Sequence, residues 1–407
     1  MIWSVAGPAA WEKWDWTFKT LVFSAFIPLV IRSHVQIEAF AQTYLMSLAA
    51  NFIPFGIKVM ISGGGYGVNL GLIKGNSGLA EGGYLSTACL MAIPLALHFA
   101  RHSVLMPKSR FTTLAYWGIA ALALATALGT YQRSALVGLA CLALFMILRS
   151  KNKFVLLTVA GIVGAVLVYA MSDRWTSRIQ TIGEYQTESS ALVRVLVWKW
   201  TWNWVQSNPL GGGFNSYMIN QISLPPDAYN PGGSVQFGRA FHSSYFEVLG
   251  EQGYPGMLLF LGIVFATMWN LFRLSRKTAK IPELAWCSTF AIAIQTGLVA
   301  FLSAGAFVGI AFQPPFWYFV SMGVCLTAYV RRVEAGANAP TTGWRATAQR
   351  NLTVAVAVPG TEGLVKGGWR PAAAAPTVEA TANASIAAAA RNRWAAQQRG
   401  PAGRAPR

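Results

Sequence analysis

Charged residues are scarce in this chain of 407 residues: they make up 11% of it, and only 14 residues are acidic. A soluble chain carries about 25% charged residues. Hydrophobic residues make up 54% of the sequence. The composition therefore excludes an ordinary soluble globular protein and indicates a protein that crosses a membrane several times.

Cysteine and histidine are also rare. The four cysteines, Cys89, Cys141, Cys287 and Cys325, all lie inside apolar runs, and the sequence has no Cys-x-x-Cys pair. They are expected to be small core residues. His98 and His102 have the i, i+4 spacing of a metal site, but no acidic residue or cysteine stands beside them. We expect no metal and no cofactor.

Apolar runs predict an all-α polytopic membrane protein with about nine transmembrane helices. These runs are Phe18–Ile31, Ala39–Ile61, Tyr84–Ala100, Phe111–Gly129, Ala135–Leu148, Phe154–Met171, Val248–Phe272, Leu284–Phe307 and Phe316–Val330. Three parts are expected: an N-terminal periplasmic or interfacial segment (1–17), a transmembrane domain (18–330) and a disordered, basic cytoplasmic tail (331–407).

The net charge of +18 does not indicate nucleic-acid binding, because much of it lies in the tail. From Arg331 onward there are 11 Lys and Arg against 3 Asp and Glu, in a stretch rich in Ala, Gly and Pro. Such a composition is typical of a disordered segment, with weak attraction to anionic lipids as the alternative.

Basic loops predict the topology, because short loops rich in Lys and Arg stay in the cytoplasm. They follow the first, third, fifth, seventh and ninth spans, at Arg32, Arg101–Arg110, Arg149–Lys153, Arg273–Lys280 and Arg331–Arg332. The long loop 172–241 is then periplasmic, with the C-terminus inside and the N-terminus outside. An exported N-terminus without a signal sequence leads us to expect an odd number of further spans upstream.

The long loop contains a predicted helix that begins at Glu188–Ser190 and ends before Asn208-Pro209. Four tryptophans at alternate positions cannot share one face of it: Trp198, Trp200, Trp202 and Trp204. They are expected to anchor the helix at the membrane interface, with stacking on a sugar or prenyl chain as the alternative. Gly211–Gly213 lacks the Lys of a phosphate-binding loop and is expected to form a tight turn.

Three ionisable residues are predicted to meet on the outer face. Arg133 lies in the hairpin 130–134, Arg194 on the loop helix, and His242 just before the seventh span. Two guanidinium forks would bind a pyrophosphate, and a histidine can take a proton near neutral pH. The alternatives are contacts of the arginines with lipid headgroups and a capping role for the histidine.

Two acidic residues, Glu247 and Glu251, enter the seventh span, where such residues are usually functional. Gly250 and Gly253 beside them allow the helix to break. Glu251 would then either cap the broken helix or reach an arginine.

Four motifs in this order resemble those of the O-antigen ligase/polymerase superfamily: Thr130–Leu139, Leu192–Trp200, Asn208–Tyr217 and His242–Gly256. Trp14–Lys19 and the loop Gly63–Gly83 look closest to the exosortase-associated O-antigen ligase-like branch. The resemblance covers roughly residues 11–330. Family members have about twelve spans, so the resemblance implies that about three N-terminal spans are absent here.

The resemblance implies a metal-independent, inverting glycosyltransferase in the bacterial inner membrane. It would move glycan from an undecaprenyl-diphosphate carrier to an acceptor hydroxyl on the periplasmic face. Arg133 and Arg194 would bind the diphosphate and His242 would be catalytic; further candidates are Glu251, Tyr245 and Asn76. The expected partners are the lipid-linked donor, a glycolipid, polysaccharide or protein acceptor, and membrane lipids, with no nucleic acid.

Other functions stay open from the sequence. A repeat-unit polymerase or a protein O-oligosaccharyltransferase would use the same residues. A transporter of lipid-linked glycan would more often show paired charges at mid-membrane and internal repeats. An inactive fragment is the remaining alternative.

Overall fold

The computed structural model describes residues 4–62, 79, 81–150, 152–154, 157–158, 161, 189–225 and 232–337. Nine α-helices lie within these residues: α1 (Pro8–Val30), α2 (His34–Ser62), α3 (Gly82–His102), α4 (Arg110–Gly129), α5 (Arg133–Arg149), α8 (Ser189–Ser207), α9 (Ser244–Thr278), α10 (Ala285–Ala304) and α11 (Pro314–Ala337). The described chain is mainly helical, as its composition predicts.

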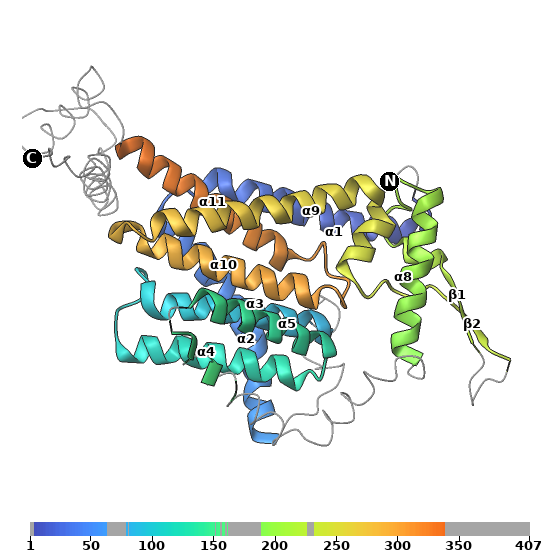
Figure 1. Cartoon of the computed structure of the whole chain (residues 1–407), viewed down its shortest axis with the longest axis horizontal. Helices are drawn as coiled ribbons and strands as arrows, with labels where there is room; N and C mark the ends of the chain where they lie inside the picture. The colour runs from blue at the N-terminus through green and yellow to red at the C-terminus, as the bar shows by residue number, and fades with distance from the viewer. Residues whose placement is uncertain are drawn as a thin grey trace, which may run out of the picture.

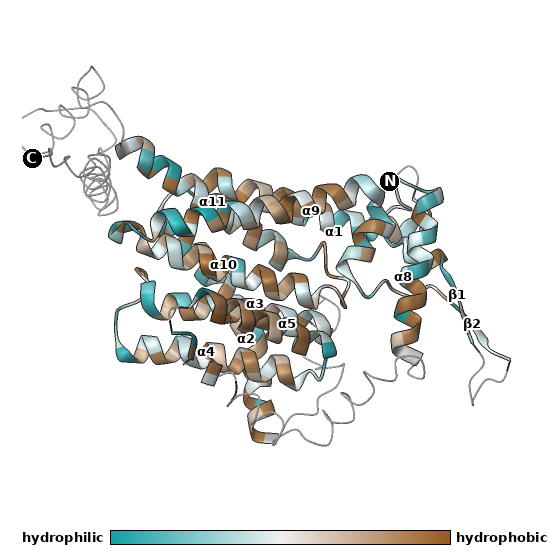
Figure 2. Cartoon of the chain, in the orientation of Figure 1, coloured by the Kyte–Doolittle hydropathy of each residue, from teal (hydrophilic) through white to brown (hydrophobic). Residues whose placement is uncertain are grey.

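Apart from α2 and α8, these helices run back and forth along one bundle, and α2 crosses them steeply (Figure 1). Helix α10 packs against α3, α5, α9 and α11, and α4 packs against α2 and α3. Large apolar side chains remain exposed on the outer surface, for example Phe111, Leu258 and Phe265. Apolar residues run along the bundle helices, while polar residues gather near the helix ends (Figure 2).

Five helices are long and apolar enough to cross a membrane: α2, α3, α4, α9 and the segment Pro282–Ala304 that contains α10. This supports a helical membrane protein. Three other predicted spans fall on α1, α5 and α11, which pack in the same bundle but do not reach that length and apolarity. The predicted span 154–171 lies largely outside the described residues, so the total of nine stays a prediction.

The helices at the two ends of the described chain extend across the predicted boundaries. Helix α1 begins at Pro8 and so includes residues 8–17 of the predicted N-terminal segment. Helix α11 continues to Ala337, beyond the predicted end of the last span at Val330. The rest of the predicted tail lies outside the described residues.

The basic loops gather at one end of the bundle, which we call the basic end: the C-terminal ends of α1, α3, α5, α9 and α11. Lys277 of α9 pairs with Glu334 of α11 at 2.6 Å. The Arg332 guanidinium donates to the Arg32 carbonyl at 2.7 Å. The charge pattern that predicted one side of the membrane thus corresponds to one end of the structure.

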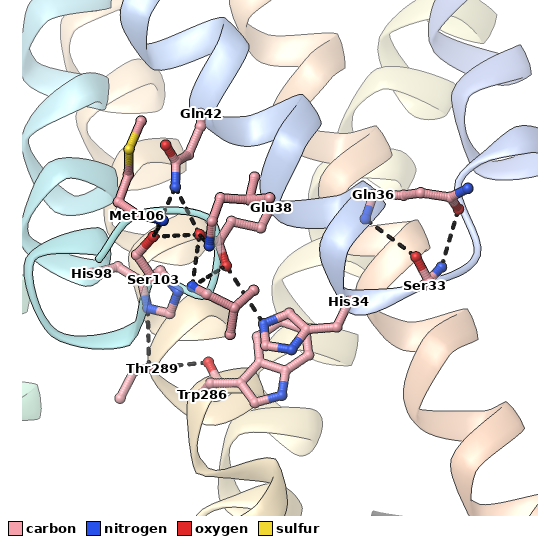
Figure 3. Close-up of polar contacts among 12 residues, drawn as sticks. Ser33, His34, Gln36, Glu38, Gln42, His98, Ser103, Met106, Trp286 and Thr289 are labelled. Carbon is pink, nitrogen blue, oxygen red and sulfur yellow. Dashed lines mark hydrogen bonds and ion pairs between the residues drawn. The ribbon is translucent and has the colours of Figure 1, made fainter. Parts of the chain in front are cut away.

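A buried carboxylate, Glu38 of α2, organises the α3–α4 turn at the basic end (Figure 3). It accepts hydrogen bonds from the Ser103 hydroxyl at 2.6 Å and from the backbone N–H of Val104 at 2.9 Å. The Gln42 amide also donates to it. These bonds satisfy the carboxylate and fix the connection between α3 and α4.

The opposite end holds the segment between residues 189 and 243. Helix α8 lies across the end of the bundle rather than along it (Figure 1). Strands β1 (Gln221–Leu224) and β2 (Ser234–Phe237) follow as an antiparallel pair in which Gln221 faces Phe237. The prediction of an all-α fold missed this ribbon, because a short exposed hairpin carries no long apolar run.

Candidate functional site

Backbone strain marks the end of the bundle that carries α8. Among the described residues, three that are not glycine have positive φ: Tyr131 (53°), Asn215 (57°) and His242 (48°). This conformation is uncommon for side chains with a Cβ, although His and Asn adopt it more often than most. All three lie in the predicted motifs, with Tyr131 two residues before Arg133 and His242 itself among them. Strained backbone of this kind clusters at functional sites.

The N-termini of α3, α5 and α9 meet at this end. A Cβ placed on Gly82, the first residue of α3, would lie 3.1 Å from the amide nitrogen of Gln132, which caps α5. A Cβ on Gly83 would lie 2.9 Å from Val308, whose carbonyl accepts from the Ser244 hydroxyl of α9. A helix N-terminus carries about half a positive charge. Three of them together favour an anion.

Arg133 is half-buried as the first residue of α5, directly after the hairpin Thr130–Gln132. A cation at this position is opposed by the helix dipole, which favours negative charge there. A bound anion would relieve that opposition. The predicted tight hairpin is confirmed, since only three residues separate α4 from α5.

His242 is half-buried and stands just before the N-terminus of α9. Desolvation lowers its pKa below the usual value, and the positive charges of Arg194 and Arg239 lower it further. The imidazole is therefore held in the neutral form, which can accept a proton. Arg194 lies close enough to lower the pKa of His242 electrostatically, and so does Arg239, which the sequence did not indicate.

Glu81 immediately precedes α3 and adds a carboxylate to this group. Its residue surface is partly exposed, but surrounding atoms desolvate the carboxyl and raise its pKa. The charge of Glu247 raises this pKa further, whereas Arg194 lowers it. Arg194 therefore acts electrostatically on both Glu81 and His242, which connects α3, α8 and α9 at one place.

Helix α8 positions Arg194 by packing one stripe of side chains on β1 and the start of α9. Val193, Val197 and Phe241 belong to the same small buried cluster. The Trp198 indole N–H donates to the Phe241 carbonyl at 2.8 Å, and its ring stacks on Phe246. This hydrogen bond fixes the backbone of Phe241, the residue that directly precedes His242.

The other tryptophans of α8 do not share one environment, and Trp200 also packs against the buried cluster of Val193, Val197 and Phe241. Trp200 and Trp204 stack on each other with centroids 5.5 Å apart, and half of Trp202 is exposed. Helix α8 begins at Ser189 and ends at Ser207. Both the predicted beginning at residues 188–190 and the predicted end before Asn208 are therefore confirmed.

Glu251 is completely buried and does not reach an arginine. Its Oε1 atom lies 2.7 Å from the Lys13 ammonium, which also lies 2.6 Å from Glu247 Oε1. Within the described residues Glu251 Oε2 has no hydrogen-bond partner. The sequence analysis did not predict Lys13, whose partners lie more than two hundred residues away along the chain.

The two remaining candidates give no support from geometry. The Tyr245 hydroxyl donates to the Leu302 carbonyl at 2.9 Å, so it faces α10 within the bundle. Asn76 lies outside the described residues.

The glycine-rich segment Gly211–Gly213 packs against a break in α9. Gly253 has φ 63° and ψ −161°, which interrupts the helix after residue 252. The N–H groups of Gly212 and Gly213 donate to the carbonyls of Gly250 and Glu251, both at 2.9 Å. A Cβ on Gly211 would lie 2.6 Å from the Gly253 nitrogen. The predicted tight turn and broken helix are both confirmed, and the glycines are required by the close approach of two backbones.

Two cavities open at the basic end. One of about 540 Å³ is lined by residues around the α3–α4 turn, and one of about 460 Å³ by residues of α9 and α11. Neither is lined by His242, Arg133 or Arg194. These cavities and the candidate site thus belong to opposite ends of the bundle.

Part of this geometry lies in a known family region, because the O-antigen ligase family matches residues 118–261. This match supports the resemblance to the O-antigen ligase superfamily. A second family, of unknown function (DUF5935), matches residues 3–104. No curated protein matches this chain.

The O-antigen ligase region contains Arg133, Arg194 and His242, whereas Lys13 and Glu81 fall in the region of unknown function. This match supports a ligase- or polymerase-like function and, in general terms, lipid-linked glycan and acceptor substrates. The more specific likeness to the exosortase-associated branch stays a prediction.

Proposed function

We propose that this protein is a metal-independent, inverting glycosyltransferase. It transfers glycan from an undecaprenyl-diphosphate carrier to an acceptor hydroxyl at the periplasmic face of the bacterial inner membrane. The observation that supports this most directly is the meeting of Arg194 with His242, whose pKa is lowered, beside the N-termini of α5 and α9 in the O-antigen ligase region and the N-terminus of α3.

The diphosphate would bind where positive charge gathers. Arg133 and Arg194 offer planar guanidinium groups that match phosphate oxygens, and the N-termini of α3, α5 and α9 add aligned backbone dipoles. The negative charge on the carrier grows as the bond between the sugar and the diphosphate breaks. Groups already aimed at that charge lower the barrier, because they need no reorganisation during the reaction.

His242 would act on the acceptor. Its neutral imidazole takes the proton of the acceptor hydroxyl while the oxygen attacks the anomeric carbon. The attack comes from the side opposite the diphosphate, so the new glycosidic bond has inverted configuration. The products are the glycosylated acceptor and undecaprenyl diphosphate.

The decisive experiment measures transfer by the purified protein with a lipid-linked donor, an acceptor and a chelator. We expect His242→Ala to lose transfer by about 10²- to 10⁴-fold, the usual contribution of a general base, while donor binding is retained. His102→Ala, at the basic end of α3, is the matched control and keeps activity.

Substantial transfer by His242→Ala would remove the base assignment. Loss of wild-type transfer in chelator would contradict the metal-independent mechanism. The length of the product separates a ligase, which adds one chain, from a polymerase, which adds successive repeat units.

A further inference from the structure

Lys13 of α1 is buried in a cluster of charges that the proposed chemistry does not use. Its ammonium lies 2.6 Å from Glu247 and 2.7 Å from Glu251, and its side chain is 10% exposed. The rings of Phe312 and Phe214 flank it at 5.2 and 5.8 Å. Buried charges are costly unless each is paired, so these three side chains hold one another in place.

The N-terminal segment makes further contacts to the same region. The Val5 N–H donates to the Gly212 carbonyl at 2.9 Å, and the Asn215 side-chain amide donates to the Ala9 carbonyl at 2.8 Å. The Asn215 backbone N–H donates to Glu251 Oε1 at 2.9 Å. Residues 4–13 and the turn 208–216 therefore hold the first part of α9 from one side.

That first part, residues 244–252, is separated from the rest of α9 by the break at Gly253. Its direction is not fixed by a continuous helix, because the chain turns at that residue. The direction of this short helix is fixed by its side chains instead. Lys13 forms ion pairs with Glu247 and Glu251, and the Ala311 N–H donates a hydrogen bond to Glu247 Oε2 at 2.9 Å. His242 stands immediately before this short helix.

We infer that Lys13 is a positioning residue for His242: it clamps the short helix 244–252 to α1 and so sets where the imidazole meets the acceptor. This rests on the proposed function. It also assigns a role to the region of unknown function at residues 3–104, which supplies the clamp to the O-antigen ligase region.

The test compares Lys13→Met with Lys19→Met. Both lysines lie on α1 and both pair with carboxylates at similar distances, but the Lys19–Asp15 pair is exposed. Misplacement of a catalytic group by about 1 Å costs about 10²-fold in rate. We expect kcat of Lys13→Met to fall by about that factor with the donor KM unchanged, because the arginines remain. Lys19→Met keeps both values.

Hydrogen exchange gives a second readout that does not depend on activity. Backbone amides of residues 208–216 and 241–252 should exchange faster in Lys13→Met than in Lys19→Met, while those of α3 and α10 should not. If the wild type shows no transfer, the proposed function fails, yet these exchange data still decide whether Lys13 clamps the helix.

Lys13→Arg keeps the charge and guards against loss of folding. Its larger head group, between two aromatic rings, should displace the carboxylates and lower kcat less than Lys13→Met does, again with the donor KM unchanged. Wild-type kcat and wild-type exchange in the folded Lys13 variants would overturn the inference. An equal loss through KM would overturn it too, because that result places Lys13 in donor binding.

Discussion

At the scale of single residues, the proposed chemistry depends on keeping His242 neutral. Burial and the charges of Arg194 and Arg239 all lower its pKa below the usual value of about 6.5. A base with a lowered pKa stays unprotonated at neutral pH. Activity should therefore be full at pH 7 and decline only as the pH falls below about 6.5, through the lowered pKa.

Arg239→Met tests this electrostatic argument. Removing one positive charge stabilises the imidazolium, so the pKa of His242 rises and the acidic limb of the pH–rate profile moves to higher pH. The measurement is kcat/KM as a function of pH for both proteins. A limb that stays in place, or that moves to lower pH, would show that His242 is not the group that titrates.

Arg133 tests the role of guanidinium geometry. Arg133→Lys keeps the positive charge at the start of α5 but loses the planar fork that can hold two phosphate oxygens. We expect it to retain a small part of the activity and Arg133→Ala almost none, with protein levels near wild type. A fully active Arg133→Ala would reduce this residue to a contact with lipid headgroups.

Candidate residues that stand in compact motifs can be proposed from the sequence, whereas those whose surroundings depend on distant partners cannot. His242 and Arg194 are found from their local context, and the structure puts them within electrostatic reach of each other. Lys13 looks like a lysine near an interface until Glu247 and Glu251 are placed beside it. Glu81 likewise comes near Arg194 and Glu247 only when α3, α8 and α9 meet in the folded protein.

At the scale of elements, the break in α9 is the feature on which the site depends. Gly253 adopts a positive φ, and a Cβ there would clash with the Pro209 carbonyl oxygen. The backbone of the turn 208–213 occupies the space that a side chain would need. The Gly250–Gly253 spacing made a broken helix predictable, whereas the contact with the turn was not.

Gly253→Ala should therefore be strongly destabilising. The backbone conformation of Gly253 (φ 63°, ψ −161°) is essentially restricted to glycine and costs roughly 1–3 kcal/mol for a residue with a Cβ. The clash with Pro209 adds to this cost. We expect a lower melting temperature in detergent and a loss of transfer. Gly262→Ala, in the same helix with nothing within 4 Å of its added Cβ, is the control and should melt like the wild type. Equal melting of the two variants would contradict the importance of the break.

At the scale of the whole molecule, the arrangement separates two chemical environments. Basic residues gather where α1, α3, α5, α9 and α11 end, and the candidate site lies where α3, α5 and α9 begin. The five apolar helices were predictable from composition, because their runs are long. The crossing helix α8 and the β1–β2 ribbon were less so, because their packing depends on tertiary contacts.

Single-cysteine labelling tests how this molecule sits in the membrane. In a background without the four native cysteines, a cysteine at position 230 should react with an impermeant reagent in intact cells. A cysteine at position 152 should not, because the basic loops stay in the cytoplasm. The reverse pattern would overturn the proposed periplasmic location of the site.

The ion cluster of Lys13 also has a consequence for how the protein is made. Lys13 and Glu247 are separated by 234 positions, so at about 5–20 residues per second their synthesis is about 12 to 47 seconds apart. Throughout that interval the Lys13 amine lacks the carboxylate with which it pairs in the folded protein. Helix α1 is therefore made long before the partner that fixes it, and the ion cluster can form only after the start of α9 has emerged.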